Sequence, residues 1–280
     1  MNYIISVGQS AAYALMVVLF WYISKLITDR MTKADDDEHI EGRKNLSMAL
    51  MRTGQYLGIA IGMAAALTGG ESGAHSFVKD LTLLAVDGAL IVALFQVSRV
   101  ICDKLIITMA CNDTEIENNN IAVGLAECGM LVGTGLIMNG AFSGEGDLLQ
   151  GVVFFLLGQA VFIAAVRLFT AIKSYHLIKE IVQGNVSAGI ILAGNFISLG
   201  FIMRTSVSGA FTGWANDLLS FSISAVTGVV FLILFQWIAD LLFLPSTKER
   251  QQIVDNKNSA AALIIAGIQT GLSIIVGSLV

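Results

Sequence analysis

The chain has 280 residues, of which 55% are hydrophobic and 13% are charged, and its mean hydropathy is +0.77. A soluble domain carries about 25% charged residues, so this composition predicts an integral membrane protein. The net charge of −5 argues against nucleic acid as a partner, because nucleic acid binding needs a concentrated basic surface. The first partner that we expect is therefore the lipid bilayer.

Eight apolar stretches are long enough to cross a bilayer core, which takes about 20 residues of helix. Basic residues follow the first stretch and do not precede it, so we expect a retained helix and not a signal peptide. The pattern predicts an all-α, polytopic membrane helix bundle of about eight transmembrane helices. The stretches lie near residues 3–25, 46–68, 77–101, 121–142, 149–172, 186–208, 217–244 and 259–280.

The basic residues between these stretches predict the orientation of the chain. Most of them lie in the first, third, fifth and seventh connectors, whereas the segment from Gly140 to Gly151 has none. Short connectors that are rich in lysine and arginine stay in the cytoplasm. We therefore expect the odd-numbered connectors to be cytoplasmic and both termini to lie outside.

An internal repeat relates the even-numbered stretches. Each begins at an asparagine, and each has a glycine nine residues later. Because each repeat contains two helices, we expect four parallel copies whose pseudo-symmetry axis runs along the membrane normal. The repeat-signature residues are Asn45, Asn120, Asn185 and Asn258, with Gly54, Gly129, Gly194 and Gly267.

A second signature divides the chain into halves. Residues 140–144 read Gly-Ala-Phe-Ser-Gly and precede Asp147-Leu-Leu, and residues 209–213 read Gly-Ala-Phe-Thr-Gly and precede Asp217-Leu-Leu. The signature asparagines Asn45 and Asn185 are 140 residues apart, half of the chain. We predict two four-helix membrane units, residues 1–143 and 144–280.

The asparagine-led helix of small residues after a charged connector resembles the bacterial inner-membrane family called domain of unknown function 350. The resemblance covers the whole chain in two tandem copies. It implies a multi-pass protein of the bacterial inner membrane, and it carries no established activity. The chain departs from the family pattern by placing Arg52 and Glu127 in the glycine-rich helices.

Each signature residue has a structural and a functional interpretation. Gly54, Gly58 and Gly62 form a glycine zipper, which favours close helix packing, with a pore lined by backbone as the alternative. Asparagine is a preferred helix N-cap, because its side-chain oxygen accepts an otherwise unpaired backbone N–H. Four equivalent asparagines around one axis would alternatively form a ring at an inner vestibule.

Ionisable residues inside a bilayer are costly and are therefore the best functional candidates. Arg52 and Glu127 each follow their signature asparagine by seven residues, about 10 Å into the membrane. Our hypothesis is that these two residues pair. The alternative is that Arg52 reaches the headgroups while Glu127 bonds to another neighbour.

Asp87 lies near the middle of the third stretch with no charged residue within one turn. It is either a proton or cation site or a structural acid. Gln55, Asn195 and Gln269 are expected to form hydrogen bonds between helices.

No catalytic or metal-binding motif is present in the sequence. The acidic connector at residues 35–41 lacks the alternating ligands and the glycine of an EF-hand loop. Cys102, Cys111 and Cys128 have no CxxC spacing. We therefore expect no enzyme, no cofactor and no metal.

Two functions remain open. One is permeation of an ion or small solute through a pseudo-symmetric helix bundle, carried by Asp87, Arg52 and Glu127. The other is a non-catalytic membrane scaffold that recruits cytoplasmic or envelope-stress partners. Exposed glycine faces on the terminal helices would permit a homo-oligomer.

Overall fold

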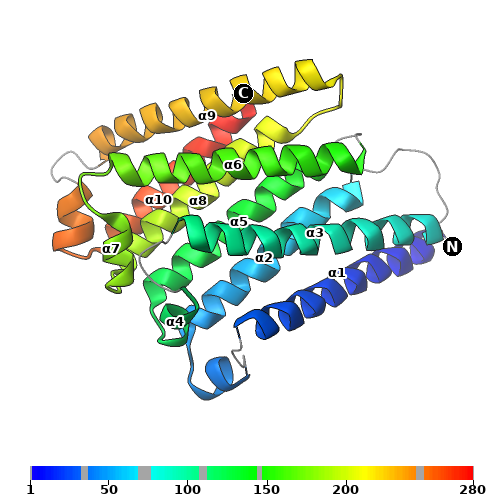
Figure 1. The fold of residues 1–280 in the computed structure, drawn as a ribbon, viewed down its shortest axis with the longest axis horizontal. Coiled ribbons are helices and arrows are strands. Elements are labelled where there is room, and N and C mark those ends of the chain that lie inside the picture. The colour runs from blue at the N-terminus through cyan, green and yellow to red at the C-terminus, as the bar shows by residue number, and fades with distance from the viewer. Residues whose placement is uncertain are drawn as a thin grey trace.

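The computed structural model describes residues 2–32, 37–68, 77–106, 112–143, 147–243 and 249–279. Every regular element in these residues is a helix, as the sequence predicts, and eight of the helices are long (Figure 1). The long helices are α1 (Asn2–Thr32), α2 (Leu46–Thr68), α3 (Phe77–Leu105), α5 (Ile121–Phe142), α6 (Leu148–Ile172), α8 (Val186–Val207), α9 (Trp214–Phe243) and α10 (Ser259–Leu279).

The long helices coincide with the eight predicted apolar stretches. Seven of them, all except α2, are long and apolar enough to cross a membrane by length and composition. The remaining helix α2 has 23 residues but carries Arg52 and Gln55, which lower its hydropathy. The chain is therefore a polytopic membrane helix bundle, and the eighth span and the orientation stay predictions.

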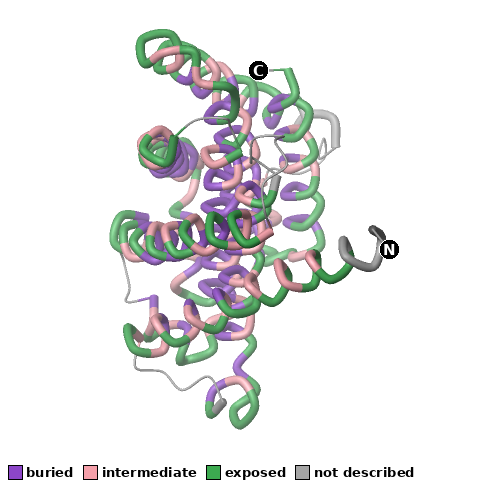
Figure 2. The backbone as a smooth tube through the Cα atoms, turned by 90° about the vertical axis from the view of Figure 1, so that its right-hand side faces the viewer, coloured by how far each residue is buried: buried purple, intermediate pink, exposed green. Residues whose placement is uncertain are grey.

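The long helices form two layers. Helices α2, α5, α8 and α10, which we call the asparagine layer, lie side by side and run in one direction (Figure 1). Helices α1, α3, α6 and α9, the covering layer, cross them and run the opposite way. Figure 2 shows that the buried residues concentrate where the layers meet.

The asparagine layer is a row and not a ring. Helix α5 packs between α2 and α8, and α8 packs between α5 and α10, so α2 and α10 form opposite edges of the layer (Figure 1). The repeats therefore do not surround a central axis within one chain. The alternative of a ring of four asparagines does not fit this arrangement.

Glycine lets the helices of this layer approach until backbone meets backbone. An added Cβ atom at Gly54 would lie 2.6 Å from the Cα atom of Cys128, and one at Gly129 would lie 2.5 Å from the Cα atom of Ala193. At Gly194 it would lie 2.6 Å from the Cβ atom of Ala266. The equivalent glycine of each repeat thus forms a close helix–helix contact, which we call a seam. The row contains three such seams.

Short helices in the connectors complete each repeat, and the sequence analysis did not predict them. They are followed by residues with left-handed backbone: Lys44 (φ 55°), Asn119 (φ 61°), Gly184 (φ 80°) and Lys257 (φ 46°). This turn places each signature asparagine at the start of its long helix. The short helices are η1 (Asp37–Gly42), α4 (Asn112–Glu117), α7 (Leu177–Val182) and η2 (Gln251–Asp255).

We predict that Gly129→Ala lowers the free energy of unfolding by about 1–3 kcal/mol, because its methyl group would force α5 and α8 apart. The measurement is thermal or denaturant unfolding of the purified protein in detergent. Gly8→Ala is the matched control, since a Cβ atom at this helical glycine meets nothing within 4 Å. The control should be neutral or stabilising by up to about 1 kcal/mol. Equal changes in the unfolding free energy of the two variants would contradict the close α5–α8 contact at Gly129.

Candidate intramembrane polar site

Each signature asparagine caps its own helix, and Asn45, Asn120 and Asn185 also join two repeats. The Oδ1 atom of Asn120 accepts hydrogen bonds from the backbone N–H groups of Ala122 and Val123, and Asn45, Asn185 and Asn258 make equivalent bonds. The Nδ2 group of Asn45 donates to the carbonyl oxygen of Ile116 in the next repeat, at 2.8 Å. Asn120 and Asn185 donate in the same way to the Ile181 and Ile253 carbonyl oxygens, at 3.2 and 2.8 Å. These asparagines are therefore structural links between repeats.

A buried polar network joins α1, α2 and α3. The Nε2 group of Gln55 donates to the hydroxyl oxygens of Ser24 and Thr28, at 2.7 and 3.1 Å. The Nε2 group of Gln96 donates to the same two hydroxyl oxygens, each at 3.0 Å. Ser24 and Thr28, one turn apart on α1, are fully buried. A network satisfied in this way fixes how the three helices fit together.

Arg52 belongs to this network and does not pair with Glu127. Its guanidinium forms an ion pair with Asp29 of α1 and donates to the Oε1 atom of Gln55 at 3.1 Å. The hypothesis of an Arg52–Glu127 pair is therefore wrong. Its physical reason is the parallel repeat: equivalent positions on side-by-side parallel helices point in the same direction, so their side chains do not face each other.

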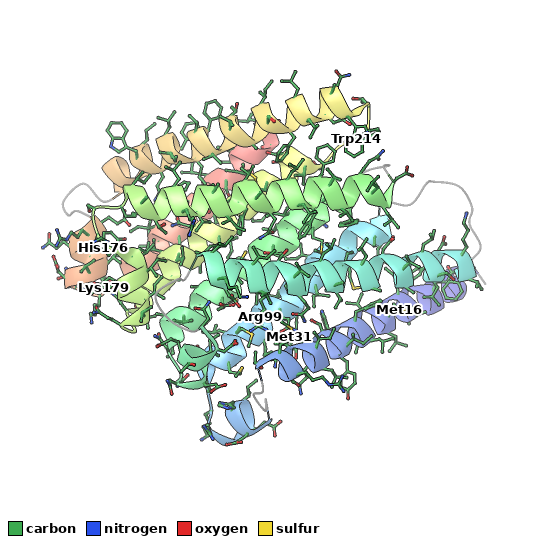
Figure 3. All side chains as sticks on the ribbon, in the orientation of Figure 1. Met16, Met31, Arg99, His176, Lys179 and Trp214 are labelled. Carbon is green, nitrogen blue, oxygen red and sulfur yellow. The ribbon has the colours of Figure 1, made fainter. Side chains whose placement is uncertain are left out.

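Glu127 lies in a second polar cluster, formed by Arg99, Asp103, Asn112, Asp113 and Glu127, which we call the Glu127 cluster. The Nδ2 group of Asn112 donates to the Oε1 atom of Glu127 at 2.7 Å. The guanidinium of Arg99 lies 3.1 Å from the Oδ1 atom of Asp113 and 3.9 Å from the Oδ2 atom of Asp103. Helices α3, α4 and α5 supply these residues, and Figure 3 shows Arg99 toward the end of α3 that faces α4.

Glu127, Arg99 and Asn112 of the cluster are buried but incompletely hydrogen-bonded, whereas the side chains of Asp103 and Asp113 are 22% and 41% exposed. The exposed fractions are 1% for Glu127 and 3% for Arg99, and 6% for Asn112. Four of their polar atoms have no hydrogen-bond partner among the described residues: Oε2 of Glu127, Nε and Nη1 of Arg99, and Oδ1 of Asn112. Native proteins rarely leave such atoms unpaired, so these atoms are candidates for contact with a further polar group.

Asp87 lies at a different place, in a cavity of about 730 Å³ between the beginnings of α3, α6 and α9. The residues of the second repeat signature, Asp147 and Asp217, also line it. Asp147 begins α6 through a capping box with Gln150, and Asp217 accepts bonds from Thr212 and Gly213. Asp87 has no such bond to a described residue, so it is the acid in this cavity that is available to a ligand.

Within the described residues of the second half, the positions equivalent to Arg52 and Glu127 carry no polar cluster. Leu192 and Ile265 replace Arg52 and Glu127 at the equivalent positions. Asn195 and Gln269 are buried, and their side-chain amides have no hydrogen-bond partner among the described residues. The bonds between helices expected for Asn195 and Gln269 are therefore not formed, whereas Gln55 does form them.

The sequence analysis missed several members of these clusters. Ser24, Thr28 and Asp29 of α1 were not singled out, although their spacing of one turn places Ser24 and Thr28 on one helix face. Arg99 and Asp103 have the same spacing and form an ion pair along α3. A search for polar residues three or four apart in apolar helices would have found both pairs.

Metal binding has no support in the described residues, which contain no group of three or more His, Cys, Asp or Glu arranged around an ion. Part of the acidic connector and Cys111 lie outside these residues.

A family model described as Domain of Unknown Function (DUF350) matches the chain twice, over residues 3–142 and 145–280. The chain belongs to this family. The resemblance drawn from the sequence is thereby confirmed. A "UPF0719 transmembrane protein" of Aquifex aeolicus (strain VF5) is 22% identical over 259 residues, which cover 90% of this chain and 93% of the relative. No solved structure matches the chain.

The two family matches differ in their polar content. The first match of the DUF350 chain contains Asp29, Arg52, Asp87 and Glu127. The second match repeats the glycines and asparagines without these charges. The residues that pack the helices are therefore common to both matches, whereas these four charged residues occur in the first match.

A double-mutant cycle on the unfolding free energy distinguishes the two partners considered for Arg52. We expect a coupling energy of about 1–3 kcal/mol between Arg52→Met and Asp29→Ala, because removing either residue leaves the other's charge without its partner. The coupling between Arg52→Met and Glu127→Gln should stay below about 0.5 kcal/mol. A larger coupling with Glu127 than with Asp29 would contradict the structure.

Proposed function

We propose that this protein lets a small monovalent cation cross the bacterial inner membrane along α3. The observation that carries the proposal is the Glu127 cluster, in which Glu127 and Arg99 are buried in a membrane helix bundle with polar atoms that have no hydrogen-bond partner among the described residues. Ionisable residues at such positions usually face a protein interior or a water-filled path and mark routes for ions.

The charge of the cluster favours a cation. Its three carboxyl groups, on Asp103, Asp113 and Glu127, lie around the single guanidinium of Arg99. The carboxyl groups therefore outnumber the positive charge of the cluster. The Oε2 atom of Glu127 and the Oδ1 atom of Asn112, which have no hydrogen-bond partner among the described residues, are the oxygen atoms that a passing cation would contact.

Helix α3 connects this cluster with the cavity at Asp87. Asp87 and Asp103 are sixteen residues apart on α3, about 24 Å along the helix axis. A bilayer core is about 30 Å thick, so this separation spans most of it. One helix thus carries polar sites at both ends of the proposed route.

The section of α3 between these sites is closed in this structure. Ile91, Val92 and Phe95 are buried there with exposed fractions of 0 to 2%. Passage of a cation would require these side chains to move. The structure therefore corresponds to a closed state of the proposed path.

Flux into liposomes tests the proposal. Full-length protein is reconstituted, and uptake of K⁺, Na⁺ and H⁺ is measured separately with fluorescent indicators. We expect Glu127→Gln to lower the flux of the transported cation by about tenfold or more, because an interaction with a charged group is worth about 1.5–3 kcal/mol.

Glu180→Gln is the matched control for this experiment. This substitution removes a carboxyl group from α7, which is far from α3 in the sequence. The Oε2 atom of Glu180 accepts a hydrogen bond from Asn185 at 2.9 Å. The control should leave the flux unchanged. Wild-type flux equal to that of empty liposomes for all three cations would overturn the proposal and favour the scaffold.

We also propose that both chain ends lie outside the cytoplasm, as the basic residues of the odd connectors indicate. Ser174 is exposed in the connector between α6 and α7. Thr212 is exposed at the opposite end of the helices, in the α8–α9 turn. In a chain without its native cysteines, Thr212→Cys should react with an impermeant maleimide in intact spheroplasts, and Ser174→Cys only after lysis. The opposite labelling would reverse the orientation.

A further inference from the structure

We propose that copies of this chain join head to tail, with α10 of one copy packed against α2 of the next, so that the asparagine layer continues from chain to chain. The proposal concerns assembly and is independent of the proposed cation path. It starts from the seam between neighbouring helices of the asparagine layer. The chain forms this seam three times, and the outer faces of α2 and α10 have no helix against them in the described residues.

Helices α2, α5 and α8 each bury one face against the next helix of the layer. Helix α10 leaves the equivalent face exposed. Ile191 and Ile202 of α8 are fully buried, whereas their equivalents Ile264 and Ile275 of α10 are 56% and 58% exposed. A Cβ atom added at Gly267 meets nothing within 4 Å, unlike at the other three signature glycines. The seam-forming face of the repeat is therefore complete on α10 and has no helix against it in the described residues.

The signature asparagine of this repeat gives independent evidence. Asn45, Asn120 and Asn185 each donate to an isoleucine carbonyl oxygen of the following repeat. Asn258 donates to the Oε1 atom of Gln252 in its own repeat, at 2.9 Å, and to no carbonyl of a further repeat in the described residues. Asn258 thus lies ready for an acceptor that a fifth repeat would supply.

Helix α2 offers the complementary edge. Thr53 occupies the position that Cys128, Ala193 and Ala266 use to meet a glycine, and it is exposed. Leu46 and Leu57 on the same side are 50% and 49% exposed. The Ile40 residue of η1 is only half-buried, whereas its equivalents Ile116, Ile181 and Ile253 are buried.

A second copy fits this pair of edges better than lipid does. Apolar side chains gain little by leaving lipid, so helices associate in membranes through small residues and hydrogen bonds, and the α10 edge provides both. Ala49 and Ala60 of α2 are equivalent to Ala262 and Ser273 of α10. Ala262 and Ser273 are buried in the α8–α10 seam, so small residues at these two positions fit such a contact. Such a contact is heterologous and adds copies side by side in the membrane plane.

The internal seams predict which residues meet between copies. The hydroxyl oxygens of Ser187 and Ser259 lie 3.2 Å apart across the α8–α10 seam. The equivalent pair between two copies is Ala260 of one and Leu46 of the next. Disulfide cross-linking of this pair in native membranes therefore reports the proposed contact.

The experiment uses full-length chains without native cysteines that carry two different tags. One chain has Ala260→Cys and the other has Leu46→Cys. We expect oxidation to give a dimer containing both tags only when the two are expressed together, and Gly267→Leu in the first chain to abolish it. Gly8→Leu, at a helical glycine with equally open surroundings, should not.

Two controls make every outcome decisive. Ser187→Cys with Ser259→Cys in one chain should form an internal disulfide, which shows that the background is folded and oxidised. Ala260→Cys with Leu149→Cys, a residue 66% exposed on α6, should give no dimer. Absence of the mixed dimer while the internal disulfide forms would overturn the proposal, and so would equal cross-linking of Ala260→Cys alone, which indicates a symmetric contact.

Discussion

The close approach of parallel helices at one glycine per repeat is the constraint on which the rest of this structure depends. At Gly54, Gly129 and Gly194 a side chain would overlap the neighbouring helix. Lipid provides no hydrophobic drive for helices to associate, so such backbone contacts and the asparagine bonds at their ends must hold the row together. Because every seam joins the same two faces of the repeat, the helices form a row. The two edges of this row, on α2 and α10, expose different faces.

The covering layer is where the two halves differ. Helix α1 carries Ser24, Thr28 and Asp29, which complete the network around Gln55 and Arg52. The residues 140 positions later in α6 are Ala164, Leu168 and Phe169, so the second half has no partners for polar groups at this place. Repetition thus preserves the seams of the row, and substitutions in both layers of the first half create the polar chemistry.

The sequence predicted the elements well and their tertiary partners poorly, for a physical reason. The repeat signature marks the first residue of α5 and α8 and the seam glycines, because capping and close packing depend on short-range spacing. The partner of Arg52 depends on how α1 crosses α2, and no periodicity encodes that crossing. The short connector helices were missed because six residues give too little periodicity to recognise.

A row of helices also restricts where transport can occur. Four repeats around one axis would place a path between them, lined by equivalent residues from every copy. In a row no such axis exists within one chain, and the layer interior is filled by backbone contacts at the glycines. A path must then run between the two layers, where α3 meets α5 and where Glu127 and Arg99 are buried. The proposed path uses residues of α3, α4 and α5 from one half of the chain, so each added copy of the chain would bring one such path of its own.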